Sequence, residues 1–176
     1  MGTTSIRNGL LTRAGDLAED VRGKHKDAVL IVHVRVAFRE GHPEAPQDDR
    51  QPLWAAVRAN NKLVLGTEAA AIYPQLKADA HASSEPQVVK CRISAFSTTQ
   101  LASILRAHSV TELAWAGVSS SGVILTSTCE AFDMDYPCTV LSDVCGDKAD
   151  VHEFLCSSVF PKRCKVMTAS EWLATL

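Results

Sequence analysis

The sequence lacks the short motifs by which many small domains reveal their chemistry. Its six cysteines include no CxxC pair, and their spacing matches no zinc or disulfide framework. Neither a GxGxxG nor a GxxxxGK[ST] motif occurs, so nucleotide binding has no support. We therefore expect no metal and no cofactor, and free thiols favour a reducing compartment, the cytosol.

Long apolar runs and an excess of charge are also missing. No apolar run is longer than Ala28–Val32, which is too short to cross a membrane. No apolar segment follows Arg7 and Arg13, as a secretory signal would require. The net charge of −2 gives a nucleic acid or an anionic membrane no electrostatic attraction, so neither is an expected partner.

What is present is a composition typical of one globular domain covering residues 1–176, with 46% hydrophobic and 22% charged residues. Apolar periodicity predicts helices and strands that alternate along the second half of the chain. The predicted strands are Ala28–Val36, Gln87–Cys91, Glu112–Val118, Cys138–Ser142 and Lys165–Met167. The predicted helices are Leu10–His25, Leu53–Ala59, Thr98–His108, Ser121–Met134, Asp150–Val159 and Ala169–Ala174. This order predicts an α/β fold, a three-layer α/β/α sandwich around a mostly parallel sheet of about five or six strands.

The turn Gly117–Gly122 is the segment most suggestive of function, because it joins an apolar strand directly to a helix. Such a turn points backbone N–H groups and the positive end of a helix dipole at whatever lies above it. Ser119, Ser120 and Ser121 are either helix caps or donors to a substrate carbonyl. A nucleophilic serine would need an adjacent base, and the sequence identifies none.

Two further polar residues lie on the predicted strands. Lys90 ends one of them, where parallel sheets carry their sites, and it could orient an anion or simply be solvated. His33 lies inside the apolar strand Ala28–Val36, and we interpret it as a hydrogen-bonded core residue.

Several segments together resemble one known family. They are Leu30–Arg35, Val88-Val89-Lys90 with Ser94-Ala95-Phe96, Gly117-Val118, Ala131 with Asp133 and Tyr136, Leu141–Cys145 and Glu171-Trp172-Leu173. In combination they resemble the isochorismatase-like cysteine hydrolases, which include nicotinamidases and other amidases. The resemblance covers roughly residues 5–176 and implies a Rossmann-like topology. It also implies assembly as a homodimer or a larger homo-oligomer.

The family's catalytic triad, an Asp, a Lys and a Cys, is only partly matched. Lys90 fits the lysine, but the resemblance places Val123 where the cysteine belongs and Ser5 where the aspartate belongs. The resemblance further implies a cis peptide bond at Val118–Ser119. It also implies a substrate site formed by Val118, Ser119, Ser120, Gly122 and Phe96.

The strand that precedes the aspartate in the family is expected to be truncated, because only four residues lie before Ser5. Without that strand, its neighbours in the sheet are expected to lack hydrogen-bond partners. Truncation would explain Ser5 but not Val123.

Three functions are compatible with this pattern. The first is a family member without thiolate catalysis that binds a small molecule near Lys90 and the turn Val118–Gly122. The second is an active hydrolase of small amides or related compounds by a route that uses no cysteine. The third is a non-catalytic partner that oligomerises with active homologues. Phe38–Pro52 and Gly66–Leu76 are expected to line the pocket.

Overall fold

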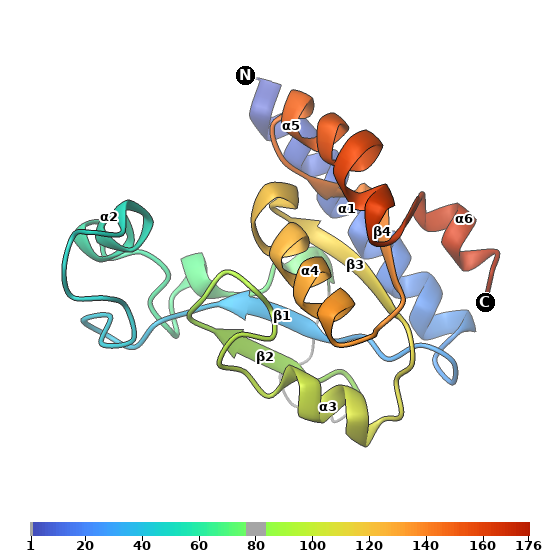
Figure 1. Ribbon diagram of the computed structural model, residues 1–176, viewed down its shortest axis with the longest axis horizontal. Coiled ribbons are helices and arrows are strands. Elements are labelled where there is room, and N and C mark those ends of the chain that lie inside the picture. The colour runs from blue at the N-terminus through green and yellow to red at the C-terminus, as the bar shows by residue number, and fades with distance from the viewer. Residues whose placement is uncertain (1, 77–83) are drawn as a thin grey trace.

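The computed structural model describes the backbone of residues 2–76 and 84–176, and side chains from Gly9 onward within those ranges (Figure 1). The strands are β1 (His33–Val36), β2 (Gln87–Lys90), β3 (Leu113–Val118), β4 (Cys138–Gly146) and β5 (Lys165–Met167). The α-helices are α1 (Gly2–Lys24), α2 (Pro52–Ala59), α3 (Leu101–Ala107), α4 (Leu125–Asp133), α5 (Ala149–Phe154) and α6 (Ala169–Leu173). Short 3₁₀ or π turns are η1 (Glu68–Ala70), η2 (Pro74–Leu76), η3 (Ser120–Ile124), η4 (Leu155–Val159) and η5 (Phe160–Lys162).

The predicted fold class is confirmed, because parallel strands alternate with helices along the chain. The sheet, however, is divided. Within the described residues, β1 pairs only with β2, and β3, β4 and β5 form a separate sheet in that order. The expected single sheet of about five or six strands is therefore replaced by two sheets of two and three strands.

The division leaves β1 and β3 each with a single partner strand in the described structure. β1 is also shorter than predicted, because Ala28–Val32 precedes it without strand structure. β3 is apolar throughout, yet none of its residues is fully buried. In β4, by contrast, Val140 pairs with Trp115 on one side and with Val166 on the other and is fully buried, and Leu141 beside it is 1% exposed. Cover over both faces of a sheet is what excludes water from the side chains of an apolar strand.

Helix α1 begins earlier than the prediction Leu10–His25 and packs against β4 and η2 (Figure 1). Its residue Leu17 packs beside Ala114 of β3 on the cluster that contains Leu141. Near its other end, the guanidinium of Arg22 binds the Glu85 carboxylate through Nε at 2.6 Å and Nη2 at 2.8 Å. Helix α1 thus contacts the three-stranded sheet and, through Glu85, the segment just before β2, while no strand joins the two sheets within the described residues.

The opposite face is covered by α3 and α4. Their residues Leu105 and Ala131 belong to one buried cluster, against which Val34 of β1 and Trp115 of β3 both pack. Both sheets therefore border the same apolar core, although no hydrogen bonds connect them within the described residues. A separate cluster around Phe38 anchors α2 and the loop before it, away from this core (Figure 1).

The interpretation of His33 as a hydrogen-bonded core residue is confirmed. Its side chain is 7% exposed, and Nε2 lies 2.9 Å from Oε2 of Glu85. The six cysteines are all free. No helix in the described part of the chain combines the length and apolar character that crossing a membrane requires.

Candidate functional site

The turn after β3 has the backbone geometry that the family resemblance implied. The peptide bond Val118–Ser119 is cis, and Gly117 before it has a φ of 134°. A side chain at Gly117 would strain the backbone in that region, so glycine suits the position. The turn then enters the π-turn η3, which continues into α4.

Several backbone donors of this turn are already occupied within the chain. The N–H of Ser121 donates to Oδ2 of Asp147 at 2.8 Å, and its hydroxyl donates to the same oxygen at 2.6 Å. The N–H groups of Gly122 and Ile124 both donate to the carbonyl of Ser119 at 3.2 Å. These three amides are therefore not the free cradle that the sequence pattern suggested.

The Asp147 carboxylate is the acceptor for the Ser121 amide and hydroxyl of this turn. Burial raises the pKa of its carboxyl, but the hydrogen bonds from Ser121 and from the Lys148 backbone outweigh it, so the pKa lies below its usual value. A carboxylate stabilised in this way at the start of a helix satisfies donors that a substrate oxyanion would otherwise use.

Val123, which the family resemblance places at the position of the cysteine, contributes only packing. It is half-buried and packs against both of the apolar clusters that flank β3 and β4. A valine side chain carries no lone pair, so it cannot attack a carbonyl carbon.

Ser5, which the family resemblance places at the aspartate position, has a backbone that belongs to helix α1 rather than to the end of a strand.

Lys90 is buried, at 4% exposure, at the end of β2. Its Nζ donates to the carbonyls of Arg92 and Ile93, each at 2.7 Å. Desolvation lowers the pKa of Lys90 to about 8. In the described structure its hydrogen bonds thus secure the loop after β2, and none joins it to the turn after β3.

Phe96, predicted to touch substrate, lies in the core. It is 7% exposed and meets Trp115 edge-on, with ring centroids 6.0 Å apart. The loop that carries it is tied to α4, because Ser94 Oγ donates to Glu130 at 2.5 Å and the Ala95 N–H donates to Ser127 Oγ at 2.9 Å.

The structure also reveals a polar pair that the sequence did not suggest. Ser120 Oγ lies 2.8 Å from Nδ1 of His152, and Nε2 of that ring lies 3.0 Å from the carbonyl of Ser142. Because a carbonyl only accepts, Nε2 carries a proton, which leaves Nδ1 of a neutral ring free to accept from the hydroxyl. Ser120 is completely buried. No spacing rule links two residues this far apart in the chain, so only the fold brings them together.

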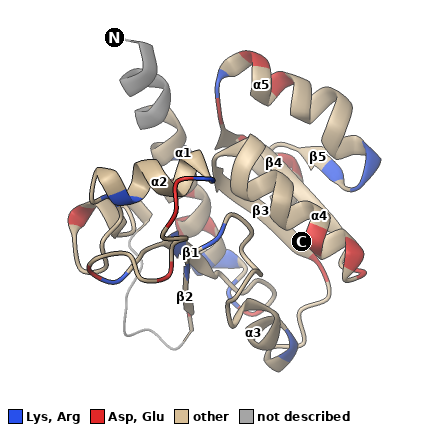
Figure 2. Cartoon of the chain, turned by 60° about the vertical axis from the view of Figure 1, so that its left-hand side comes forward, with Lys and Arg blue, Asp and Glu red and all other residues tan. Residues whose placement is uncertain are grey.

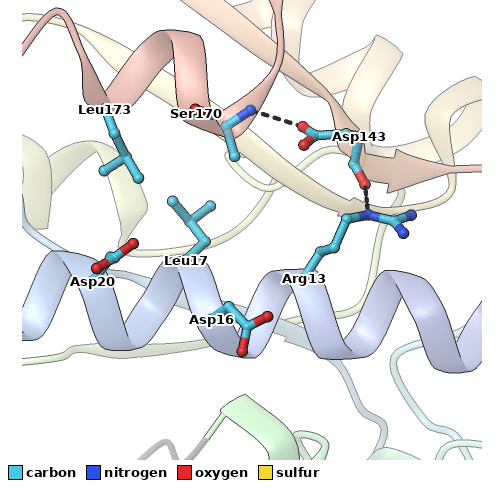
Figure 3. A pocket seen from close by; sticks show the side chains of 8 residues that line it. Arg13, Asp16, Leu17, Asp20, Asp143, Ser170 and Leu173 are labelled. Atoms are coloured by element: carbon cyan, nitrogen blue, oxygen red, sulfur yellow. Dashed lines mark hydrogen bonds between the residues drawn. The ribbon is translucent and has the colours of Figure 1, made fainter.

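Two hollows lie on the surface. One, of about 410 Å³, is lined by Arg35 and Gln87 of the two-stranded sheet and by residues of the 66–72 segment. The other, of about 220 Å³, lies between α1 and α6, where Arg13 Nε donates to the Asp143 carbonyl at 2.7 Å (Figure 3). Part of the segment Gly66–Leu76, which was predicted to line the ligand pocket, lines the first hollow. Lys90, the centre of the predicted pocket, does not line it. In the described residues, no group of three or more His, Cys, Asp or Glu is arranged to hold a metal ion.

A comparison with family models identifies one family for this chain. The family model described as "Isochorismatase domain" matches residues 5–171. No curated protein matches the chain by sequence.

Solved structures have the same fold. An isochorismatase family protein from Desulfovibrio vulgaris has a TM-score of 0.80 and 24% identity, covering 95% of this chain and 84% of that one. A cysteine hydrolase from Pseudomonas syringae has a TM-score of 0.81 and 18% identity, covering 95% and 79%. An N-carbamoylsarcosine amidase from Thermoplasma acidophilum has a TM-score of 0.72 and 16% identity, covering 96% and 87%.

Proposed function

The chain belongs to the isochorismatase family, and we propose that it is a member without cysteine-based hydrolysis that binds a small molecule and does not turn it over. The observation that carries this proposal is Val123, which stands packed in apolar surroundings where the family resemblance requires a thiolate. The helical backbone at Ser5 supports it, because no strand end presents a carboxylate from that position. The occupied amides of Ser121 and Gly122 support it further.

The ligand position has two candidates. The first is the predicted position at Lys90 and the turn Val118–Gly122, where the side chain of Val118 is 60% exposed. The hollow beside Arg35 has a volume of about 410 Å³, and one nitrogen of the Arg35 guanidinium donates to the Ala70 carbonyl at 2.8 Å. We favour the hollow, because an arginine and backbone groups around a concave surface are suited to a small polar ligand.

Hydrolysis is tested with nicotinamide and N-carbamoylsarcosine, by measuring the ammonia that each would release. We expect no release above the rate in buffer, from the wild type and from Val123→Cys alike, because a thiol at position 123 still lacks a carboxylate base. Turnover by the wild type that disappears in Lys90→Met would overturn the proposal.

Binding is tested by calorimetric titration of the same two compounds. Saturable heat that is lost in Arg35→Met and kept in Lys90→Met would place the ligand in the hollow. The opposite pattern would place it at the predicted site. Absence of heat with a wider panel of small amides and carboxylates would reject a binding role and favour a non-catalytic oligomerisation partner.

A second function, hydrolysis by a serine, has one observation in its favour. The Ser120–His152 hydrogen bond supplies the base that the sequence did not identify. The complete burial of Ser120 opposes it, since no substrate reaches the hydroxyl in this conformation. Ammonia release that is abolished by Ser120→Ala and by His152→Gln, with unchanged thermal stability, would establish this alternative.

Two predictions about the protein in its surroundings stay open. The homodimer or larger homo-oligomer follows from the family resemblance and is tested by sedimentation. A cytosolic location follows from the six free thiols and is tested by fractionation.

A further inference from the structure

The hollow beside Arg35 is lined by two side chains of opposite charge that do not pair with each other. Its volume of about 410 Å³ lies in the range that is usual for small-molecule sites, roughly 300–1,000 Å³. Arg35 lines it from β1 and Glu68 lines it from η1. No ion pair joins these two described side chains, so both charges remain available to a ligand.

Strand pairing places the polar floor of the hollow. Arg35 lies two residues after His33 on β1, and His33 is opposite Gln87 of β2. Side chains two residues apart on a strand, and those directly opposite each other on paired strands, project from the same face of a sheet. Arg35 and Gln87 therefore share one face of the two-stranded sheet. β3, in contrast, carries no charged residue (Figure 2).

The polar groups of the hollow keep unused hydrogen-bonding capacity. Nη1 of Arg35 donates to the Ala70 carbonyl at 2.8 Å, which fixes the guanidinium and leaves its other nitrogens without a partner in the part of the chain that the structure describes. The Glu68 carboxylate and the Gln87 side-chain amide have no partner among those residues either. A guanidinium has five N–H donors, so the remaining ones can bind a carboxylate of a ligand.

We propose that this hollow binds a small zwitterionic amino acid, with the carboxylate on Arg35 and the ammonium on Glu68. This ligand class rests on the binding function proposed above for the same hollow. A ligand with only a carboxylate would bring its charge near Glu68 without compensation, and a ligand with only an ammonium would do the same near Arg35. A zwitterion pairs with both groups at once. Ala71 and Ile72, which also line the hollow, would contact its carbon chain.

The test is calorimetric titration of the full chain with glycine, 4-aminobutanoate and 5-aminopentanoate, which differ in the spacing of their two charges. Pentanoate and pentylamine are the single-charge controls. We expect at least one of the amino acids to bind about tenfold or more tightly than either control, because each control leaves one charged group of the hollow unpaired.

Variants of the lining residues locate the ligand. Glu68→Gln keeps the size of an exposed side chain, so it should leave thermal stability unchanged, weaken amino-acid binding about tenfold and not weaken the binding of pentanoate. Arg35→Met should remove the binding of the amino acid and of pentanoate, with a melting curve to show that the chain is folded. Glu112→Gln, which alters an exposed carboxylate that lines neither hollow, should bind as the wild type does.

Three results would overturn the proposal, and they differ in what they say about the hollow. Amino acids that bind no more tightly than pentanoate and pentylamine would reject the ligand class, whereas nicotinamide or N-carbamoylsarcosine binding that is lost in Arg35→Met would still support the proposed binding function. Amino-acid binding that is equal in Glu68→Gln and the wild type would show that the ammonium lies elsewhere. Absence of heat with every compound would reject the hollow as a binding site.

Discussion

The two sheets of this protein are stabilised in different ways. The three-stranded sheet has a buried centre, because β4 is paired on both sides and its Val140 is fully buried. The two-stranded sheet has no central strand, and a charged cluster of Arg22, Glu85 and His33 connects its start to α1. The comparison teaches that an edge strand is buried only where a helix covers its face, as Leu101 and Leu105 of α3 cover Val88 of β2, and that polar contacts add to the hold on the two-stranded sheet.

The largest expected effect is a difference in unfolding free energy between a substitution in the central strand β4 and the matched substitution in the edge strand β3. Leu141→Ala in β4 removes a side chain that is 1% exposed, so we expect the free energy of unfolding to fall by about 3 kcal/mol. The matched change Leu113→Ala, in the half-buried edge strand β3, should cost about 1 kcal/mol. Urea unfolding measures both. Equal losses would mean that the edge of β3 is as well covered as β4.

The next effect concerns the charged cluster of the two-stranded sheet. The hydrogen bond from Arg22 outweighs burial and, with the bond from His33, lowers the pKa of Glu85 to about 2, against an ordinary value of 4.5. Its stabilising contribution is therefore complete above pH 4.5 and is lost as the pH falls toward 2. We expect Glu85→Gln to cost about 2–3 kcal/mol at pH 7.

The difference between Glu85→Gln and the wild type should disappear near pH 2, as measured by urea unfolding across the pH range. Asp20→Asn is the control, because Asp20 forms an exposed pair with Lys24 and should have little effect. A Glu85 variant whose cost did not change with pH would show that the ion pair contributes nothing.

A smaller effect is expected at the carboxyl end of the two-stranded sheet. Burial lowers the pKa of Lys90 to about 8 from 10.5, so between these values the unfolded chain keeps a proton that the folded chain has released. The free energy of unfolding of the wild type should therefore rise between pH 8 and 10.5 by about 1–2 kcal/mol relative to Lys90→Met. The comparison with the variant cancels the cysteine titrations, which act in the opposite direction. A constant difference would mean that Lys90 is solvated.

The smallest effect is expected at the corresponding end of the three-stranded sheet. Asp147→Ala removes the acceptor of the Ser121 amide and hydroxyl, at a cost of about 1 kcal/mol. Asp150→Ala, which alters an exposed carboxylate in the next helix, is the control. If Asp147→Ala were neutral in urea unfolding, water would replace the carboxylate equally well at this turn.

Much of the fold could be predicted from local patterns. Strict alternation from Gln87 onward located β2 to β5 and the helices between them to within a few residues, because each strand is apolar and each helix has one apolar face. Periodicity was less informative before Gln87. Ala28–Val32 has strand composition but lies outside β1, and α1 extends eight residues before Leu10.

The residues of the candidate site could be predicted from the sequence, but most of their hydrogen-bond partners could not. The sequence indicated Val123 in place of a nucleophile, and the family resemblance implied the cis bond at Val118–Ser119 that the backbone shows. It could not indicate that Asp147 occupies the Ser121 donors or that His152 lies beside Ser120. Those contacts depend on how β4 and α5 return to the turn after β3, which no local pattern encodes.

By itself, the sequence determined the fold class, which follows from apolar periodicity, and the family, which follows from the family-model match and from a resemblance that places Val123 at the cysteine position. Only the tertiary structure decided that the strands form two sheets and that the amides of the turn are satisfied internally. The physical reason is that strand pairing and hydrogen-bond partners join residues far apart in the chain. The composition of a strand shows which of its side chains could be buried, and the elements packed around the strand determine which of them are buried.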